Sequence, residues 1–401
     1  MSDAPDYPFA LPAPLEPAPE WARLRGECPV APVRLASGDR ALLLTRYDDV
    51  RRVLSDPRFT RQLDTGDAAR VTANEDGGVF GAQRSGTATS AGDAHKQWRR
   101  MVGKAFTVKR VAAMRPRIEA MADGLVDAMV AGGEPADLVA ALGFPLPVWV
   151  ICDLLGVPDA DRDRFAYWSD TMLSMTRYGQ EEIDAAQAQF TDYFTAHIAA
   201  KRADPGDDLL SELIGIADAE DGRLSEPLLL GTGQGLLVAG HETTANMIGK
   251  MVAMLLADRT RWMRLLADRP LVRPATEEAL RFDANPGFGM PRYLSEPVEV
   301  AGETLPAGTT VVCSLAAANR DERTFDAAAT MDLRRTPNPH LSFGAGPHAC
   351  LGQALARTEL RAVLDVLLRR LPGLRLDVPP DELPVRDGLI VGGLRRVPVR
   401  W

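Results

Sequence analysis

The sequence predicts a mainly α-helical protein with small β-sheets, folded as a single domain over residues 21–401 behind an extended, proline-rich lead-in at residues 1–20. Three observations support this fold class. Helical patterns of apolar residues recur between Lys96 and Asp258, whereas short apolar runs that suit strands occur in only a few places. Prolines and glycines are spread evenly, and the chain has no repeat, low-complexity tract or obvious linker.

The N-terminal part of the domain predicts a strand, a helix and a long loop. Residues 41–45 are a short apolar run that suits a strand, and residues 47–54 suit a helix that ends near Pro57. Residues 61–92 are small, polar and glycine-rich, with no periodicity. Long loops of this kind usually form lids or binding sites, so we expect this one to be functional.

The middle of the chain predicts a succession of helices. Three segments have helical or apolar patterns: residues 96–132, residues 136–155, and residues 159–200 with a break near Tyr178. Ser225 then offers a capping side chain for a longer helix that continues to about Asp258. That helix has about 30 residues, or roughly 45 Å of length, so it must cross the whole domain.

The C-terminal part predicts a small sheet and one more helix. Residues 298–300 and 309–315 suit strands around glycine-containing turns, which predicts a small antiparallel sheet. Residues 351–371 predict a helix that is closed by Pro372-Gly373.

Composition narrows the class of protein. Hydrophobic residues make up 46% and charged residues 25%, the balance of a soluble globular protein, and the net charge of −9 disfavours nucleic acid as a partner. The four cysteines form no C-x-x-C pair, which leaves zinc-finger and dithiol sites without support, and their small number suits a reducing cytoplasm. Because we find no signal peptide and no long apolar run, we expect a cytoplasmic protein without a membrane span.

The most informative stretch is the glycine-rich segment 343–352, which carries Cys350 just before a helical pattern. Glycines let a backbone approach a flat ligand closely or adopt positive φ. A helix N-terminus stabilises a thiolate, and a thiolate is an axial ligand of haem iron that favours O–O cleavage. On these residues alone, Cys350 is either such a ligand or a buried core thiol in a glycine-rich turn.

The pattern F-G-x-G-x-H-x-C-x-G in this segment resembles the haem-ligand loop of the cytochrome P-450 family, and the resemblance extends from about Trp21 to Trp401. It implies the cytochrome P-450 fold, a haem b cofactor (iron protoporphyrin IX) and Cys350 as the axial ligand of its iron. It also implies an NAD(P)H-dependent monooxygenase that inserts one oxygen atom from O2 into a small organic substrate such as a secondary metabolite. Since no flavin or iron–sulfur module is visible in the sequence, we expect electrons to arrive through ferredoxin reductase and ferredoxin.

Two alternatives stay open at this point. One is an enzyme of the same scaffold that performs oxidative C–C or C–N coupling, desaturation or peroxide-driven oxidation. The other is a haem-thiolate sensor without turnover, although the sequence contains no visible signalling domain.

A second motif, at residues 239–244, lies in the middle of the long predicted helix. Gly240 weakens a helix by up to about 1 kcal/mol relative to alanine, so its place beside an acid and an alcohol needs a reason. A hydroxyl that bonds to the i−4 carbonyl can open a helix and admit water, and a carboxylate can then resupply protons. The resemblance assigns the acid to Glu242 and the alcohol to Thr243, against the alternative of ordinary polar positions. His241 falls on a variable position of the family motif, so we expect a polar contact there and no iron ligand.

Glu278 and Arg281 share one helical face because they stand three residues apart. Taken alone, this spacing suits a surface ion pair worth well under 1 kcal/mol. The resemblance implies instead a structural network with Arg335 that holds the cysteine loop, although Met331 stands where the family often has phenylalanine. The segment 319–321 also matches the family, and we assign it a structural role.

The resemblance also implies positions for the two haem propionates. Four basic or imidazole side chains match family positions that bind them: His95, Arg99, Arg292 and His348. Taken alone, each of these four residues could instead be a solvated charge or a capping histidine.

Trp98 stands in a basic helix of an otherwise acidic chain, with the cations Arg99, Arg100, Lys104, Lys109 and Arg110. Such a patch can steer an acidic partner, and the resemblance implies ferredoxin; the alternative is a solvated basic face.

By position, the resemblance implies that four segments border the substrate pocket: residues 79–90, 236–239, 285–290 and 388–391. The expected pocket residues are Phe80, Leu236, Ala239, Asn285, Phe288, Met290 and Ile390. Asn285 could hydrogen-bond a substrate that carries oxygen or nitrogen.

Overall fold

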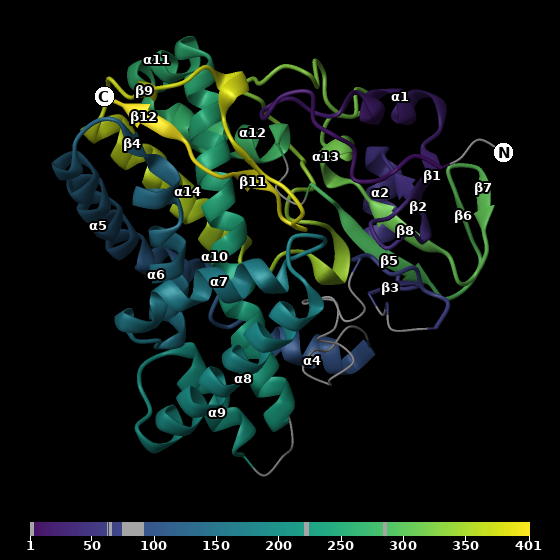
Figure 1. Ribbon diagram of the computed structural model, residues 1–401, viewed down its shortest axis with the longest axis horizontal. Coiled ribbons are helices and arrows are strands. Elements are labelled where there is room, and N and C mark those ends of the chain that lie inside the picture. Colours follow the sequence, from purple (N-terminus) through teal and green to yellow (C-terminus); the bar gives the residue numbers. More distant parts are fainter. Residues whose placement is uncertain (1–3, 62, 64–65, 74–91, 220–223, 284–286) are drawn as a thin grey trace.

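The computed structural model describes residues 4–61, 63, 66–73, 92–219, 224–283 and 287–401, and Figure 1 shows the arrangement of its elements. Helices dominate. They are α1 (Pro19–Glu27), α2 (Tyr47–Ser55), α4 (Gly92–Val102), α5 (Val108–Gly132), α6 (Pro145–Leu155), α7 (Arg162–Met172), α8 (Gln180–Ala203), α9 (Leu209–Ala217), α10 (Glu226–Ala257), α11 (Arg259–Ala267), α12 (Val272–Phe282), α13 (Leu315–Ala318) and α14 (Gln353–Arg370). Short helical turns join them at η1 (Val139–Gly143, a π-helix), η2 (Asp159–Asp161), η3 (Arg269–Leu271), η4 (Gly346–His348) and η5 (Pro380–Glu382).

The described strands form small sheets. The largest has the spatial order β1 (Val30–Arg34), β2 (Arg40–Leu44), β8 (Thr310–Cys313), β5 (Met290–Leu294) and β3 (Phe59–Thr60). Only β2 and β8 are parallel within it. The other sheets pair β6 (Val298–Val300) with β7 (Glu303–Leu305), β10 (Val385–Arg386) with β11 (Gly393–Leu394), and β12 (Pro398–Arg400) with β4 (Ala136–Asp137) and β9 (Arg375–Leu376). The mainly helical class with small sheets is therefore confirmed.

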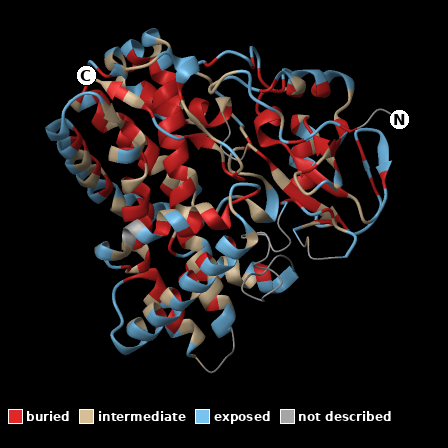
Figure 2. Ribbon diagram, viewed as in Figure 1, coloured by how far each residue is buried: buried red, intermediate tan, exposed pale blue. Residues whose placement is uncertain are grey.

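The molecule has a large helical part and a smaller part built around the five-stranded sheet (Figure 1). The helices α1, α2 and α13 accompany the sheet, whereas α5–α11 and α14 make the helical part (Figure 1). In Figure 2, α10 is the long buried helix that runs through the helical part. It packs against α6, α8 and α14, and nearly every residue from His241 to Leu256 is buried.

The long helix begins and ends where the sequence predicts. The Ser225 side chain accepts a hydrogen bond from the Leu228 amide, and Pro227 occupies the first turn, where its missing N–H costs nothing. Gly240 has a packing role, because a Cβ there would lie 2.7 Å from Cδ1 of Ile151 on α6. The glycine therefore permits the close crossing of α6 and α10.

The predicted sheet over residues 298–315 is wrong in its pairing. Ala301 and Gly302 both have positive φ, the conformation of a two-residue hairpin turn, so the chain reverses at once and β6 pairs with β7. Residues 310–313 instead form β8 and join the five-stranded sheet between β2 and β5.

Two predicted helical segments are interrupted. The pattern over residues 96–132 contains two helices, because Thr107 caps a new helix by accepting a hydrogen bond from the Arg110 amide. The apolar segment 136–155 contains β4, η1 and α6, and α6 begins at Pro145.

Candidate active site

A cavity of about 510 Å³, here the large cavity, lies between α10 and the loop before α14. This volume is typical of a ligand pocket. One wall is the stretch of α10 that includes Leu236, Ala239 and Thr243, and the facing wall is the loop that carries Cys350. The two motifs that the sequence singled out thus face one cavity.

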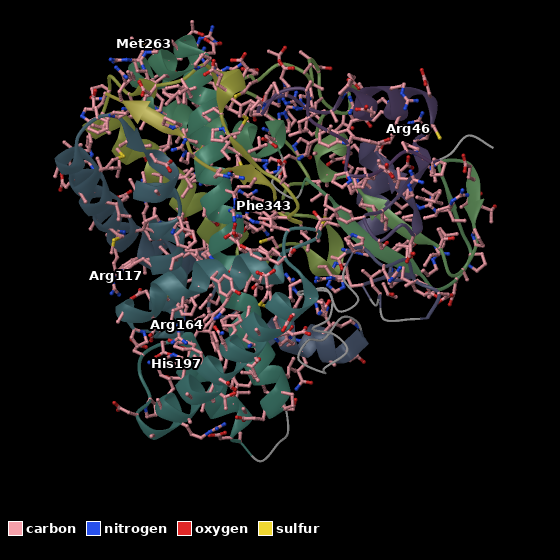
Figure 3. The ribbon with its side chains drawn as sticks, viewed as in Figure 1. Arg46, Arg117, Arg164, His197, Met263 and Phe343 are labelled. Carbon is pink, nitrogen blue, oxygen red and sulfur yellow. The ribbon has the colours of Figure 1, made fainter. Side chains whose placement is uncertain are left out.

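The cysteine loop, residues 343–352, is a tight turn that glycine makes possible. Gly344 and Gly346 have φ of 69° and 68°, in the left-handed region. A Cβ on Gly346 would lie 2.7 Å from the Leu54 carbonyl oxygen of α2. The Cys350 amide donates to the Phe343 carbonyl at 2.7 Å and closes the loop. Phe343 lies near the middle of the molecule in Figure 3, with the Arg357 guanidinium 4.3 Å from its ring centre.

The Cys350 side chain faces the large cavity and is accessible from it, although protein encloses its other sides, whereas a core thiol would face no cavity. Burial raises the pKa of this thiol. The hydrogen bond from the Gly352 amide and the charges of Arg99 and Arg357 lower the pKa, but burial has the larger effect. The helix N-terminus therefore does not by itself create a thiolate here. A coordinating metal ion would do so, because it deprotonates a bound thiol outright.

A cluster of cationic and imidazole side chains borders the same cavity. Its members are Arg61, His95, Arg99, Arg292 and His348. The rings of His95 and His348 are 4.2 Å apart. Burial, followed by the charges of Arg61 and His95, lowers the pKa of His348 to about 3. Burial also lowers the pKa of Arg292 to about 10, and its buried Nε has no hydrogen-bond partner among the described residues.

This cation cluster fits a dianionic cofactor. The guanidinium groups of Arg61, Arg99 and Arg292 gather like charges at this cavity, which raises the free energy of the site, and an anion would relieve it. The two propionates of haem supply such charge, and arginine pairs with carboxylates in bidentate fashion. The four residues predicted for this role are brought together. Arg61 was missed, because it stands at the edge of the polar loop and no motif marks it.

The α10 wall contains Ala239, Gly240, Thr243 and Thr244. The Thr243 hydroxyl donates to the Ala239 carbonyl at 3.1 Å, the i−4 hydrogen bond that the sequence suggested. The helix nevertheless stays continuous from Glu226 to Ala257, so it is not opened at this point.

Glu242 is 1% exposed and does not line the large cavity. Its Oε1 accepts from Asn246 Nδ2 at 2.9 Å and from Nη1 of Arg386 on β10. The other guanidinium nitrogen of Arg386 donates to Asp170 of α7. His241 is fully buried and does not line the large cavity. Arg386 and Asp170 escaped the sequence analysis because they belong to distant segments without a motif.

Glu278, Arg281 and Arg335 meet in one buried cluster. Arg281 donates to both carboxylate oxygens of Glu278 at 2.8 and 2.7 Å, and Arg335 Nε lies 3.1 Å from Oε2. Glu278 and Arg281 are fully buried, so this is no surface ion pair. Arg281 also donates to the Asn319 carbonyl, and the Asn319 side chain accepts from the Leu341 amide at 2.7 Å, just before the cysteine loop.

A second acid, Glu277, anchors the same region and was missed. It accepts from Arg357 and Arg361 on α14 and contacts Nε2 of His340, which precedes the loop. Burial alone would raise the pKa of Glu277. The hydrogen bonds from His340 and Arg357 outweigh burial and lower this pKa to about 2.

Of the expected substrate residues, Leu236, Ala239, Met290 and Ile390 line the large cavity. Phe288 does not, which corrects the prediction. Its buried ring packs 5.5 Å from that of Tyr7, whose hydroxyl donates to the Phe288 carbonyl at 2.6 Å. Phe80 and Asn285 lie outside the described residues.

In the basic helix, Arg99 borders the large cavity, whereas Arg100, Lys104 and Lys109 are exposed. Arg110 is also exposed but is paired with Glu212. No ion pair joins Arg100, Lys104 or Lys109 to another residue in the part of the chain that the structure describes, so these three side chains supply most of the positive charge of this surface.

Comparisons with known proteins identify the family of the chain. The family model described as Cytochrome P-450 matches residues 148–386. Nocardicin C N-oxygenase of Nocardia uniformis subsp. tsuyamanensis is 44% identical, with 100% of this chain and 99% of that protein covered. Mycinamicin IV hydroxylase/epoxidase of Micromonospora griseorubida is 43% identical, with 98% of each covered. Among solved structures, that of the putative thioether synthase SgvP, involved in the tailoring step of griseoviridin, has a TM-score of 0.93 and 39% identity over 100% of both chains.

A helical fold with one thiol in a glycine loop, facing a cation cluster and a long helix, defines a haem-thiolate protein. The chain belongs to the cytochrome P-450 family and is a monooxygenase with a haem-thiolate cofactor. Within the described residues, no helix is long and apolar enough to cross a membrane.

Proposed function

We propose that this enzyme inserts one oxygen atom from O2 into a small organic secondary metabolite, using electrons from NAD(P)H delivered by ferredoxin reductase and ferredoxin. The balanced reaction converts RH, O2, NAD(P)H and H⁺ to ROH, H2O and NAD(P)⁺. The observation that carries the proposal is Cys350 facing Thr243 across one cavity, with the cation cluster at its edge. The named substrates of the two relatives support the substrate class.

Each residue has a definite part in this proposal. Haem, when bound, supplies the iron at which O2 is reduced and cleaved. Cys350 is its thiolate ligand, and His95, Arg99, Arg292 and His348 hold the propionates, with Arg61 beside them. Thr243 delivers protons from the α10 wall, and Glu242 resupplies them. Leu236, Ala239, Met290 and Ile390 exclude water and contact the substrate.

The network of Glu278, Arg281 and Arg335 serves the cysteine loop as a scaffold. It touches no reacting atom, and its support reaches the loop through Asn319. The exposed cations Arg100, Lys104 and Lys109 form the docking surface for an acidic ferredoxin.

The first test is spectroscopic. The reduced, carbon-monoxide-bound protein should show the red-shifted haem band that gives the family its name, and Cys350→Ala should lose it. Cys28→Ala is the matched control and should keep the band. A thiolate band that persists in Cys350→Ala would reject the ligand assignment.

The second test is turnover with NADPH, ferredoxin and ferredoxin reductase. Candidate secondary metabolites are first screened by the spectral change that binding causes. A product heavier than the substrate by one oxygen atom, labelled by ¹⁸O2, supports the proposal. A coupled or desaturated product, or turnover that needs only peroxide, would contradict it.

A further inference from the structure

The N-terminal segment at residues 4–9, here the N-terminal strap, is bound to the body of the protein. The Tyr7 amide donates to the Arg34 carbonyl at 2.8 Å, and the Arg34 amide donates to the Pro5 carbonyl at 2.9 Å. The strap therefore runs parallel to the end of β1 (Figure 1). Asp6 adds an exposed ion pair with Arg34 at 2.6 Å. The sequence predicted an extended lead-in at this place and assigned it no function.

Tyr7 connects the strap to a distant segment of the chain. The residue is 2% exposed, and its hydroxyl donates to the Phe288 carbonyl at 2.6 Å. The rings of Tyr7 and Phe288 pack with their centres 5.5 Å apart, and the Phe9 ring meets the Tyr7 ring edge-on at 5.2 Å. Burial raises the pKa of Tyr7, so the hydroxyl keeps its proton and stays a donor. Because a buried hydroxyl is costly unless it is hydrogen-bonded, this bond holds the tyrosine and the Phe288 carbonyl together.

The segment that Tyr7 holds, residues 287–290 and here the partition, stands between two cavities. Gly289 and Met290 line the large cavity. Gly287 and Phe288 line a second cavity of about 260 Å³, here the small cavity, and the two cavities share no lining residue within the described part of the chain. Atoms that face a void have no packing partners on that side. The partition is thus a single layer of chain with space on both sides, and it can shift unless it is tied.

The two ends of the partition are held in different ways. Gly289 has a φ of 95°, and a Cβ there would lie 2.5 Å from the Cys313 carbonyl oxygen of β8, so this end is pressed against the sheet. The next residue, Met290, pairs with Cys313 as the first residue of β5. At the other end, Gly287 and Phe288 form no hydrogen bond between main-chain groups with another described residue. The hydroxyl of Tyr7 supplies the hydrogen bond there.

A second segment, residues 388–391, also borders both cavities and is held without a side chain. The Ile390 amide donates to the Leu173 carbonyl at 2.9 Å, and the Met175 amide donates to the Gly388 carbonyl at 2.8 Å. Main-chain hydrogen bonds of this kind do not depend on which side chains are present. The partition differs, because the hold on its first half depends on the side chain of Tyr7.

We propose that Tyr7 is a positioning residue for the substrate. By holding the Phe288 carbonyl, Tyr7 fixes Gly289 and Met290 at the wall of the large cavity, so the N-terminal strap sets the shape of the substrate space. The inference rests on the proposed function, in which Met290 contacts the substrate. A wall that is fixed before binding spares the ligand the cost of ordering it. Ligands that reach Met290 should therefore lose affinity when the tie is cut, whereas ligands too small to reach it should not.

The first experiment cuts the tie with Tyr7→Phe, which removes the hydroxyl and keeps the ring. The probes are imidazole and 4-phenylimidazole, which bind the haem iron of the holoprotein through nitrogen and shift its absorbance. Only the second probe carries a phenyl ring that needs room in the substrate space. We expect Tyr7→Phe to raise the Kd of 4-phenylimidazole several-fold and to leave the Kd of imidazole unchanged.

Tyr47→Phe is the matched control. Tyr47 is 6% exposed, its hydroxyl donates to the Pro339 carbonyl at 2.6 Å, and neither residue lines the large cavity. This variant therefore loses the same kind of hydrogen bond between distant segments. Its melting temperature should fall by about as much as that of Tyr7→Phe, but the ratio of its two Kd values should stay that of the parent. A merely structural role for Tyr7 would give both variants the same ratio.

The second experiment tests whether Tyr7 acts through Met290. Residues that act as a unit give non-additive effects in a double-mutant cycle. Met290→Ala should raise the Kd of 4-phenylimidazole, and adding Tyr7→Phe to it should cause little further change. The methyl signal of Met290, recorded by NMR in the reduced, carbon-monoxide-bound protein and assigned by its loss in Met290→Ala, gives a direct readout. It should shift or broaden in Tyr7→Phe and not in Tyr47→Phe.

A Kd ratio in Tyr7→Phe equal to that of the parent, or a Met290 methyl signal that Tyr7→Phe leaves unchanged, would overturn the inference. Additive effects of Tyr7→Phe and Met290→Ala would overturn the route through Met290. Two other outcomes would instead count against the proposed function. A parent protein without the carbon-monoxide thiolate band would refute the haem-thiolate assignment, and a Met290→Ala variant with the parent's Kd for 4-phenylimidazole would refute the place of Met290 in the substrate pocket.

Discussion

Replacing Glu277 by glutamine should destabilise the protein by an amount that depends on pH. The pKa of Glu277 falls from 4.5 to about 2, so its charged contacts with His340, Arg357 and Arg361 favour the folded state. At about 1.4 kcal/mol per pKa unit, this difference is worth about 3 kcal/mol at pH 7. Because the pKa is depressed on folding, the stabilisation is complete above pH 4.5 and is lost as the pH falls towards 2. About 2 kcal/mol should remain near pH 3.5.

Urea unfolding of the parent and of Glu277→Gln, at pH 7 and pH 3.5, measures this effect. The loss of stability in the variant should be smaller at the lower pH by about 1 kcal/mol. Glu119→Gln is the control, since Glu119 forms an i,i+4 pair with Arg115 on the surface and should cost well under 1 kcal/mol. The assignment of a strongly stabilised carboxylate is refuted if Glu277→Gln lowers the free energy of unfolding by no more than Glu119→Gln does. It is also refuted if Glu277→Gln lowers this free energy by the same amount at both pH values.

Three further outcomes follow from the site. Thr243→Ala should keep haem and substrate binding but lower product formation by about 10²–10⁴, with NADPH diverted to peroxide; unchanged coupling would argue for chemistry that does not need this hydroxyl. Arg100→Glu with Lys104→Glu should slow reduction by ferredoxin several-fold, with a loss that shrinks as salt rises; equal stopped-flow rates at low salt would show that the patch is only a solvated face. Gly346→Ala should reduce haem occupancy, because a Cβ would lie 2.7 Å from the Leu54 carbonyl on α2 and the residue has positive φ; full haem incorporation in this variant, measured by absorbance, would contradict the strain argument.

Short sequence patterns predicted the parts of the fold that depend on residues close together in the chain. Ser225 and Pro227 mark the start of α10, and the glycines around Cys350 mark the tight loop. The error over residues 298–315 came from the turn, since Ala301 and Gly302 reverse the chain too sharply for β8 to be the partner of β6.

Long-range partners could not be predicted in the same way. Arg386 is 144 positions from Glu242 along the chain, and nothing in its neighbourhood distinguishes it from any other arginine. Glu277 stands beside a motif residue, yet its meaning depends on Arg357 and Arg361 of another helix. Phe288 looked like a pocket wall, but the ring of Tyr7 provides a closer apolar partner. Contacts between distant segments decided each of these cases.

The position of β8 between β2 and β5 has a consequence for synthesis. The strand β2 is an edge without its parallel neighbour until residues 310–313 have left the ribosome. At about 5–20 residues per second, that interval lasts roughly 15 to 50 s. During this time the apolar strand Arg40–Leu44 presents unpaired N–H and C=O groups, which is the kind of edge that recruits other chains. Newly made protein should therefore aggregate most readily while it is still being translated, and faster elongation or chaperone cover of this strand should raise the soluble yield.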